Sequence, residues 1–258
     1  MMKKILIGAV VALSVAACSE SKSSATLDGN LVVGTWIFTT ENEEEVTTNG
    51  YFACRFDGSQ QDYSAWCDLG DGNSCWIYKD DVDYTIVDDL ICVYSSTDDI
   101  RVKTTISADE NGDYNIINWT ETVNIDGGVD MYDNRSYSGY RSTVDYATNI
   151  TEGIWEGRAT EGRTTNPYLR IEYHSDNTYD FQSRNSEDEE WSDKADNDGH
   201  YYILGELLGN VWVNDLNSDI EGSMSEAWIV EIEGDTMIWN ATREGGATEQ
   251  FKFTRVLE

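Results

Sequence analysis

The sequence from residue 31 onward contains two copies of one pattern, and this internal repeat restricts the possible folds more than any other feature. Gly34-Thr35-Trp36 recurs as Gly153-Ile154-Trp155, and later matches follow in the same order along both copies. Those matches include Tyr63 with Tyr179, Trp76 with Trp191, Leu90-Ile91 with Leu207-Leu208, and Tyr140-Arg141 with Thr254-Arg255. A shared order of matches indicates two successive domains with one topology. We expect these domains to span residues 31–147 and 150–258.

Within each copy, apolar and polar residues alternate in short runs that predict β-strands. In the second copy Ile171 and Tyr173 alternate with Arg170 and Glu172, which places the two sets on opposite faces of a strand. The matching run of the first copy places Cys54 on the buried face. Turn sequences separate the runs: Asp57-Gly58, Asn111-Gly112, Asp126-Gly127-Gly128, Gly234-Asp235 and Gly245-Gly246. The predicted fold class is therefore all-β.

Each copy has the length of a small antiparallel β-barrel. An up-and-down barrel pairs each strand with the next and closes on itself, which removes the exposed sheet edges. We therefore expect two tandem small antiparallel up-and-down β-barrels. The sequence does not determine whether the barrels pack together or flex around Ala147-Thr148-Asn149.

The first residues have the three parts of an export signal. Lys3 and Lys4 precede an apolar run over residues 5–15, and two alanines lead into Cys18. The apolar run is too short to cross a bilayer, which needs ~20 residues. Val15-Ala16-Ala17-Cys18 resembles the bacterial lipobox, which implies that residues 1–17 are removed and that Cys18 is acylated. An ordinary secretory signal that contains a cysteine is the alternative.

A polar, serine-rich stretch then connects Cys18 to the repeat, and residues 18–30 are expected to form the lipidated cysteine and a flexible tether. Acylation would hold the protein on a membrane through the lipid alone. Ser19 stands where an inner-membrane retention signal has aspartate. The lipobox resemblance therefore implies a lipid-anchored protein of the bacterial cell envelope, at the outer membrane.

The charge of the chain excludes some partners. It carries 49 acidic and 17 basic residues, for a formal net charge of −32. Such a surface repels nucleic acid and anionic lipid headgroups, so neither is expected as a partner. Hydrophobic residues make up 40% of the chain, which is too many for a disordered acidic protein.

Four further cysteines, Cys54, Cys67, Cys75 and Cys92, all lie in the first copy. In an oxidising compartment this predicts two disulfides. Of the three possible connectivities we favour Cys54–Cys92 with Cys67–Cys75, and a reduced set is the alternative. Zinc is disfavoured because no Cys-x-x-Cys pair is present.

The opening Gly-x-Trp and an arginine near the end of the last strand make each copy similar to the lipocalin-like domains of the bacterial calycin group. The resemblance implies that the arginine lies across the tryptophan and closes the narrow end of the barrel, as Trp36 with Arg141 and Trp155 with Arg255. A buried indole and a guanidinium attract each other by a cation–π interaction. The resemblance also implies a small, largely apolar ligand in the barrel mouth.

Four other tryptophans lie near polar or turn-rich segments, and we take them as candidate ligand contacts: Trp66, Trp76, Trp191 and Trp212. Indoles near a barrel mouth line apolar pockets or stack on sugar rings. Burial in the core is the alternative for each of them.

No metal site, cofactor or catalytic residue is expected. Residues 193–199 look like a calcium loop, but Lys194 occupies the first ligand position, and residues 109–113 have a misplaced glycine. The two histidines, His174 and His200, lie in no nucleophile or zinc motif. His174 is expected at a hairpin turn without a special role. The chain is therefore not predicted to be an enzyme.

These observations favour a membrane-tethered extracytoplasmic protein that binds a small apolar or amphipathic molecule. The alternative is an interaction module with filled barrels, which binds glycans or envelope proteins through exposed aromatic and acidic residues. A hydrolase with two carboxylates in a cleft between the barrels is a third hypothesis.

Overall fold

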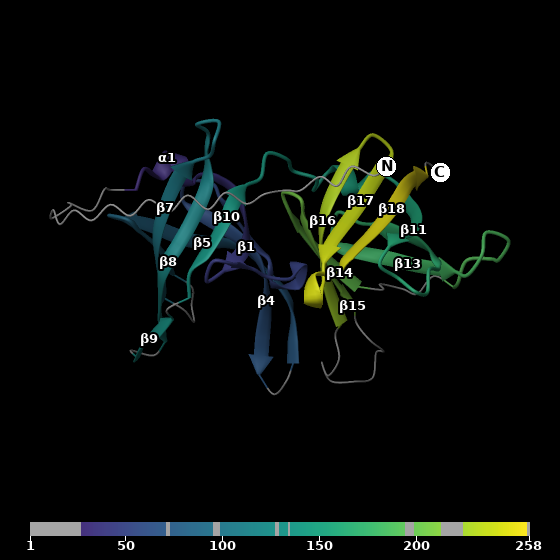
Figure 1. Cartoon of the computed structure of the whole chain (residues 1–258), viewed down its shortest axis with the longest axis horizontal. Helices are drawn as coiled ribbons and strands as arrows, with labels where there is room; N and C mark the ends of the chain where they lie inside the picture. Colours follow the sequence, from purple (N-terminus) through teal and green to yellow (C-terminus); the bar gives the residue numbers. More distant parts are fainter. Residues whose placement is uncertain are drawn as a thin grey trace, which may run out of the picture.

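The computed structural model describes residues 27–70, 73–94, 99–126, 129–133, 135–193, 199–212 and 224–256, and its strands form two antiparallel barrels that lie side by side (Figure 1). The predicted signal segment and Cys18 lie outside the described residues. None of the helices in the described ranges has the length and apolar content needed to cross a membrane.

The first barrel contains eight strands, each paired with its neighbour in the chain. They are β1 (Gly34–Glu41), β3 (Phe52–Phe56), β4 (Gln60–Gly70), β5 (Asn73–Val87), β6 (Leu90–Tyr94), β7 (Asp99–Ala108), β8 (Tyr114–Asp126) and β10 (Tyr137–Arg141). The ring closes because β10 pairs with both β1 and β8. Two short strands extend it: β2 (Glu44–Glu45) pairs with β1, and β9 (Val129–Asp133) pairs with β8.

The second barrel closes with the same order. Its strands are β11 (Ile154–Glu161), β12 (Tyr168–Tyr173), β13 (Thr178–Arg184), β14 (Gly199–Leu204), β15 (Leu207–Trp212), β16 (Met224–Glu233), β17 (Thr236–Thr242) and β18 (Thr248–Val256). The predicted all-β class and the tandem up-and-down barrels are therefore confirmed.

Short helical turns, which the sequence analysis did not predict, lead into both barrels. The helix α1 (Gly29–Val32) precedes β1, and the 3-10 turn η2 (Asn149–Thr151) precedes β11. Two more 3-10 turns lie between strands: η1 (Thr48–Gly50) and η3 (Glu244–Gly246).

In the first barrel, α1 helps to form a closed floor. The indole Nε1 of Trp36 donates a hydrogen bond to the carbonyl of Val32 at 2.7 Å, and both residues are fully buried. The guanidinium of Arg141 lies 4.2 Å from the centre of the Trp36 ring, and Arg141 also donates to the carbonyls of Leu31 and Val33. Arg141 therefore holds the helical turn and the opening strand together.

The floor of the second barrel repeats this arrangement. Trp155 Nε1 donates to the carbonyl of Ile150 at 2.8 Å, and the guanidinium of Arg255 lies 4.7 Å from the centre of the Trp155 ring. Arg255 also donates to the carbonyl of Asn149 and contacts Glu152. The structure thus brings together both tryptophan–arginine pairs that the resemblance implied.

The interior of the second barrel is filled by its own side chains. Trp228 and Trp239 lie 5.3 Å apart between ring centres, Trp239 and Phe253 lie 4.6 Å apart, and Tyr173 and Tyr201 lie 4.7 Å apart. All five are buried and belong to one hydrophobic cluster. Two groups of aromatic contacts, one of tryptophans with Phe253 and one of tyrosines, therefore occupy this barrel.

The two barrels pack against each other through a shared apolar cluster. Ile37 and Ala53, on the outer face of the first barrel, are fully buried against Leu204, Leu207 and Ala227 of the second. This answers the question that the sequence left open, because the burial of these outward-facing residues requires the barrels to be in contact.

Hydrogen bonds reinforce this contact beside the apolar cluster. The Thr48 hydroxyl of η1 accepts from the backbone N–H of Thr242 at 2.6 Å, and the Asn49 side chain accepts from the N–H of Ala227 at 3.0 Å. Buried backbone donors are therefore satisfied across the boundary between the barrels.

The favoured Cys54–Cys92 disulfide is wrong, because both residues are free, buried cysteines. Cys54 belongs to the interior cluster of the first barrel, and so do Ile91 and Val93. Since side chains alternate along a strand, Cys92 points away from that interior and cannot reach Cys54. Cys67 and Cys75 are paired in register across β4 and β5, but their side chains lie outside the described set.

Candidate functional site

A hollow between the two barrels is the main candidate for a ligand site, and we call it the inter-barrel groove. Its volume is about 450 Å³. It is lined by Arg55, Tyr78, Ala147, Thr148, Thr151, Ser175, Asn177, Tyr201, Tyr202 and Ile203. Strands of both barrels and the connection between them contribute to it, so the groove exists only because the barrels pack together.

A pair of stacked tyrosines, one from each barrel, forms the aromatic part of the groove. The rings of Tyr78 and Tyr202 are 5.2 Å apart and inclined by 9°. Burial, with a smaller contribution from Asp62, raises the pKa of Tyr78 to about 12. Tyr78 therefore remains a neutral hydroxyl at physiological pH, able to donate and accept hydrogen bonds.

Hydroxyl and amide groups form the polar part of the inter-barrel groove. Ser175 and Asn177 lie on the turn between β12 and β13, where Asn177 has a φ of 64°, a left-handed conformation that asparagine tolerates. The Tyr201 hydroxyl donates to the carbonyl of His174 at 2.8 Å. This bond fixes the turn against the barrel, so the polar groups on it are held in place.

One cation lies at the edge of the groove. Arg55 is 4.0 Å from Asp62 and 3.8 Å from Asp145, measured between the closest charged atoms. These pairs are partly exposed, so each contributes little to stability. They do offset the charge of Arg55, so this edge of the groove carries no net positive charge.

The end of the second barrel opposite its floor is closed by a cluster of two arginines and two glutamates, which we call the mouth cluster. Arg243 lies 2.8 Å from Glu249 and 3.6 Å from Glu226. Arg163 also pairs with Glu249, and it lies 3.4 Å from Glu226. Burial raises the pKa of Glu226, an effect that Arg243 and then Arg163 oppose.

The arginines of the mouth cluster also cover the aromatic interior. The guanidinium of Arg243 lies 4.4 Å from the centre of the Trp228 ring, and that of Arg163 lies 5.2 Å from the centre of the Phe251 ring. The described residues of this barrel therefore form a filled interior capped by the mouth cluster, and among them there is no open, apolar mouth of the kind expected of a ligand carrier.

The first barrel differs at the same end. Phe38 and Phe52 stack at 4.4 Å, and Trp119 lies 4.2 Å from Phe38 between ring centres. Phe52, Trp119 and Tyr137 are only partly buried, and the Trp119 Nε1 is buried without a hydrogen-bond partner. The Nε1 atoms of Trp228 and Trp239 in the filled second barrel are likewise buried without a partner, so the partly buried rings distinguish the mouth of the first barrel.

The structure describes the four tryptophans that the sequence suggests as ligand contacts to different extents. Trp191 lies beneath Arg184, at 4.3 Å from ring centre to guanidinium, and near Arg170 at 5.9 Å. It does not line the inter-barrel groove. Trp66 and Trp76 are paired in register across β4 and β5, and Trp212 ends β15. Their side chains lie outside the described set, so their roles stay predictions.

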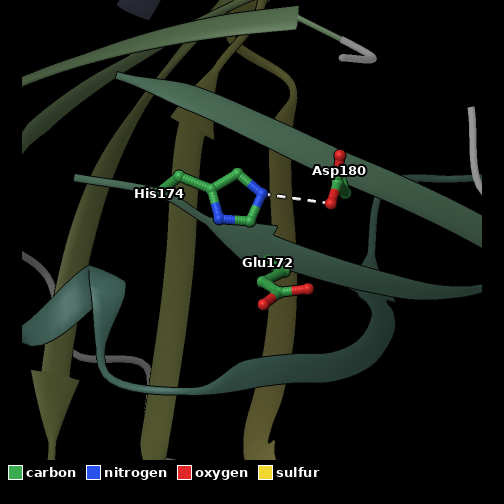
Figure 2. A group of neighbouring side chains, drawn as sticks. All are labelled: Glu172, His174 and Asp180. Atoms are coloured by element: carbon green, nitrogen blue, oxygen red, sulfur yellow. Dashed lines mark hydrogen bonds and ion pairs between the residues drawn. The ribbon is translucent and has the colours of Figure 1, made fainter. Parts of the chain in front are cut away.

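One group of polar side chains on the second barrel was missed by the sequence analysis. Figure 2 shows the imidazole of His174 directed at Asp180; Glu172 belongs to β12, and His174 is the residue directly after that strand. The His174 Nε2 and an Asp180 oxygen are 3.0 Å apart. The sequence places His174 at a predicted hairpin turn, where an exposed histidine needs no special role, and only the pairing of β12 with β13 brings Asp180 beside it.

No model of a known protein family matches the sequence, and no curated protein matches it. Among solved structures, the chain is similar to that of a protein provisionally assigned as AttH from Nitrosomonas europaea. The identity is 10%, the alignment covers 92% of this chain and 99% of the other, and the TM-score is 0.20. Similarity at this level supports no argument about the site.

Proposed function

We propose that this chain is a binding protein that takes a neutral glycan in the inter-barrel groove. The observation that carries the proposal is the groove itself, in which the Tyr78–Tyr202 stack adjoins the hydroxyl and amide groups of Thr148, Ser175 and Asn177. Sugar rings combine an apolar face with many hydroxyls, so they suit a site that offers an aromatic surface beside polar groups.

The charge of the protein limits the class of glycan. A net charge of −32 repels polyanionic polysaccharides. Arg55 is accompanied by Asp62 and Asp145 and does not reverse this. We therefore propose an uncharged oligosaccharide as the ligand.

The proposal is for binding rather than catalysis. Among the described residues that line the groove, none is a carboxylate or a histidine. Glycoside hydrolysis usually requires two carboxylates at the scissile bond. The lining chemistry therefore supports recognition of a sugar and gives no support to its cleavage.

A second candidate function is supported by the first barrel. The unpaired Trp119 Nε1 and the partly buried rings beside it suit a small amphipathic molecule that places a polar acceptor on the indole. This is the carrier function implied by the lipocalin-like resemblance, confined to the first barrel.

The proposed relationship to lipocalin-like domains is supported by the two repeated floors, in which an arginine covers the tryptophan of the first strand. We further propose that the protein is anchored through Cys18 to the outer membrane of a bacterial envelope. That proposal rests on the lipobox-like Val15-Ala16-Ala17-Cys18 and on the polar tether after it.

The glycan proposal is tested by isothermal titration of the purified protein with a panel of neutral oligosaccharides. Tyr202→Ala is expected to weaken binding about tenfold, since a stacking contact contributes about 1–1.5 kcal/mol. Ser175→Ala tests the polar wall with a smaller structural change. Tyr114→Ala is the matched control, because Tyr114 is 54% exposed and lies outside the groove.

Native mass spectrometry separates the two candidates. A bound apolar or amphipathic molecule that is lost in Trp119→Phe, but retained in Tyr202→Ala, would favour the carrier function. Absence of binding across the neutral panel, or equal losses in Tyr202→Ala and Tyr114→Ala, would refute the groove proposal.

A further inference from the structure

We propose that Glu172, His174 and Asp180 form a binding site for a divalent transition-metal ion, with Zn²⁺ as the best-suited ion. The site lies on the outer face of the second barrel (Figure 2) and is independent of the proposed glycan function.

The strand geometry places the three side chains together. Ile171 and Tyr173 of β12 face the barrel interior, so Glu172 and His174 face outward on the same side. Asp180 of β13 is the direct cross-strand partner of Glu172. The three donors therefore come from one hairpin and share one face of it.

The backbone that carries His174 is held rigidly. Its N–H donates to the carbonyl of Thr178 at 2.9 Å, and its carbonyl accepts from Asn177 at 3.1 Å. That carbonyl also accepts from the Tyr201 hydroxyl at 2.8 Å. A fixed backbone reduces the entropy lost when the side chains bind an ion.

The distances are close to those of a metal site. One donor atom from each residue lies within 4.8 Å of the other two, and the His174 Nε2 and Asp180 Oδ2 are 3.0 Å apart. Tetrahedral Zn²⁺ with bonds of about 2.0–2.2 Å separates its ligands by roughly 3.3–3.6 Å. Small side-chain rotations therefore suffice to bring all three donors onto one ion.

The donor set indicates the class of metal. One imidazole and two carboxylates suit Zn²⁺ and similar first-row ions. Calcium takes 6–8 oxygen ligands, more than two carboxylates supply. Three protein ligands leave one tetrahedral position for water, and His174 is accessible enough for this, with 34% of its side chain exposed.

Charge also favours a cation here. Glu172 and Asp180 are directly opposed across the strands, so a divalent ion between the two carboxylates would contact both of them at once. The acidic protein surface further raises the local concentration of cations.

The test is titration of the metal-free protein with Zn²⁺, followed by calorimetry and by the NMR signals of the histidine imidazoles. We expect a single tight site and a shift of the His174 Nε2 signal. His174→Ala should weaken binding at least about 100-fold, because the loss of outer partners alone costs about 10–100-fold. Asp180→Asn, which keeps the shape of the side chain, should also weaken it strongly.

His200→Ala is the matched control, because His200 is the other histidine of the chain and is not in the cluster. It should bind Zn²⁺ like the unmodified protein. A plain His174–Asp180 ion pair is the competing explanation. It would be established, and the metal site refuted, if Zn²⁺ did not shift the His174 signal or if His200→Ala and His174→Ala lost affinity equally.

Discussion

Arg243 covers the ring of Trp228 at 4.4 Å, at the opposite end of the second barrel from the Arg255–Trp155 pair. The same barrel therefore has an arginine over an indole at each end. The two arginines differ in their charged partners. Arg255 contacts Glu152, which is half exposed, whereas Arg243 contacts Glu249, of which only 10% of the side chain is exposed.

Arg243→Ala should therefore destabilise the protein by about 1–3 kcal/mol, because Glu249 and Glu226 then share the single positive charge of Arg163. The effect should depend on pH. Burial already raises the pKa of Glu226, and Arg243 opposes that shift. Without Arg243 the pKa of Glu226 in the folded protein rises further above its value in the unfolded chain. The folded state is therefore favoured while Glu226 is protonated, at a pH below the ordinary glutamate range. That stability is lost as the pH rises through the pKa that Glu226 has in the folded protein. Urea unfolding at pH 4.5 and pH 8 measures the difference. A deficit that is equal at both pH values would contradict this account.

The two residues that form the floor of the second barrel should contribute unequally to the free energy of unfolding. Trp155→Ala should lower the free energy of unfolding by about 3–5 kcal/mol, because it removes a fully buried indole. Arg255→Ala should cost about 1–2 kcal/mol, since it removes a cation–π contact and leaves the packing of the indole in place. Denaturant unfolding of both variants checks the order, and a larger loss in Arg255→Ala would show that the arginine has another role.

The state of the cysteines can be read directly by chemistry. Cys54 and Cys92 are free and buried, and burial raises the pKa of the Cys54 thiol well above its ordinary value. Neither should react with iodoacetamide in the folded protein, and both should react after denaturation without a reductant. Intact-mass measurement gives the number of labels. A Cys54–Cys92 cross-linked peptide in an unreduced digest would disprove the free state.

The contact between the barrels should be sensitive to a single buried charge. Ala53 is fully buried in the shared cluster, so Ala53→Glu would place an unpaired carboxylate there. We expect the barrels to separate, which small-angle X-ray scattering would detect as a larger radius of gyration. Thr85→Glu, on an exposed position of β5, is the control and should leave the radius unchanged. If Ala53→Glu loses glycan binding and Thr85→Glu keeps it, the groove depends on this contact between the barrels.

Much of the fold was predictable because the chemistry that builds it is local and repeated. The resemblance to lipocalin-like domains, carried by the Gly-x-Trp of each first strand and the arginine of each last strand, implied the tryptophan–arginine pairs that the structure shows at Trp36 and Trp155. Alternation placed Cys54 inward, as observed. The turns α1 and η2 were not predicted, because a helix of three or four residues is too short to show a 3.6-residue period.

The sites were harder to predict, since each depends on contacts between distant segments. Ile37 and Ala53 are apolar residues on outward positions, and alternation does not say what covers them. The groove between the barrels therefore had no sequence signal of its own. Asp180 lies beside His174 only through the strand register, and the Cys54–Cys92 pairing failed because the two side chains lie on opposite faces of their sheet.

The position of α1 has a mechanical consequence for the anchor that we propose at Cys18. Tension on such an anchor would reach the described part first at Leu27, whose N–H donates to the carbonyl of Asp88 at 2.7 Å, and then at α1. The hydrogen bond from Trp36 to Val32 and those from Arg141 to Leu31 and Val33 resist that tension together. Under pulling, the floor of the first barrel should therefore yield first, while the second barrel and its mouth cluster remain unloaded.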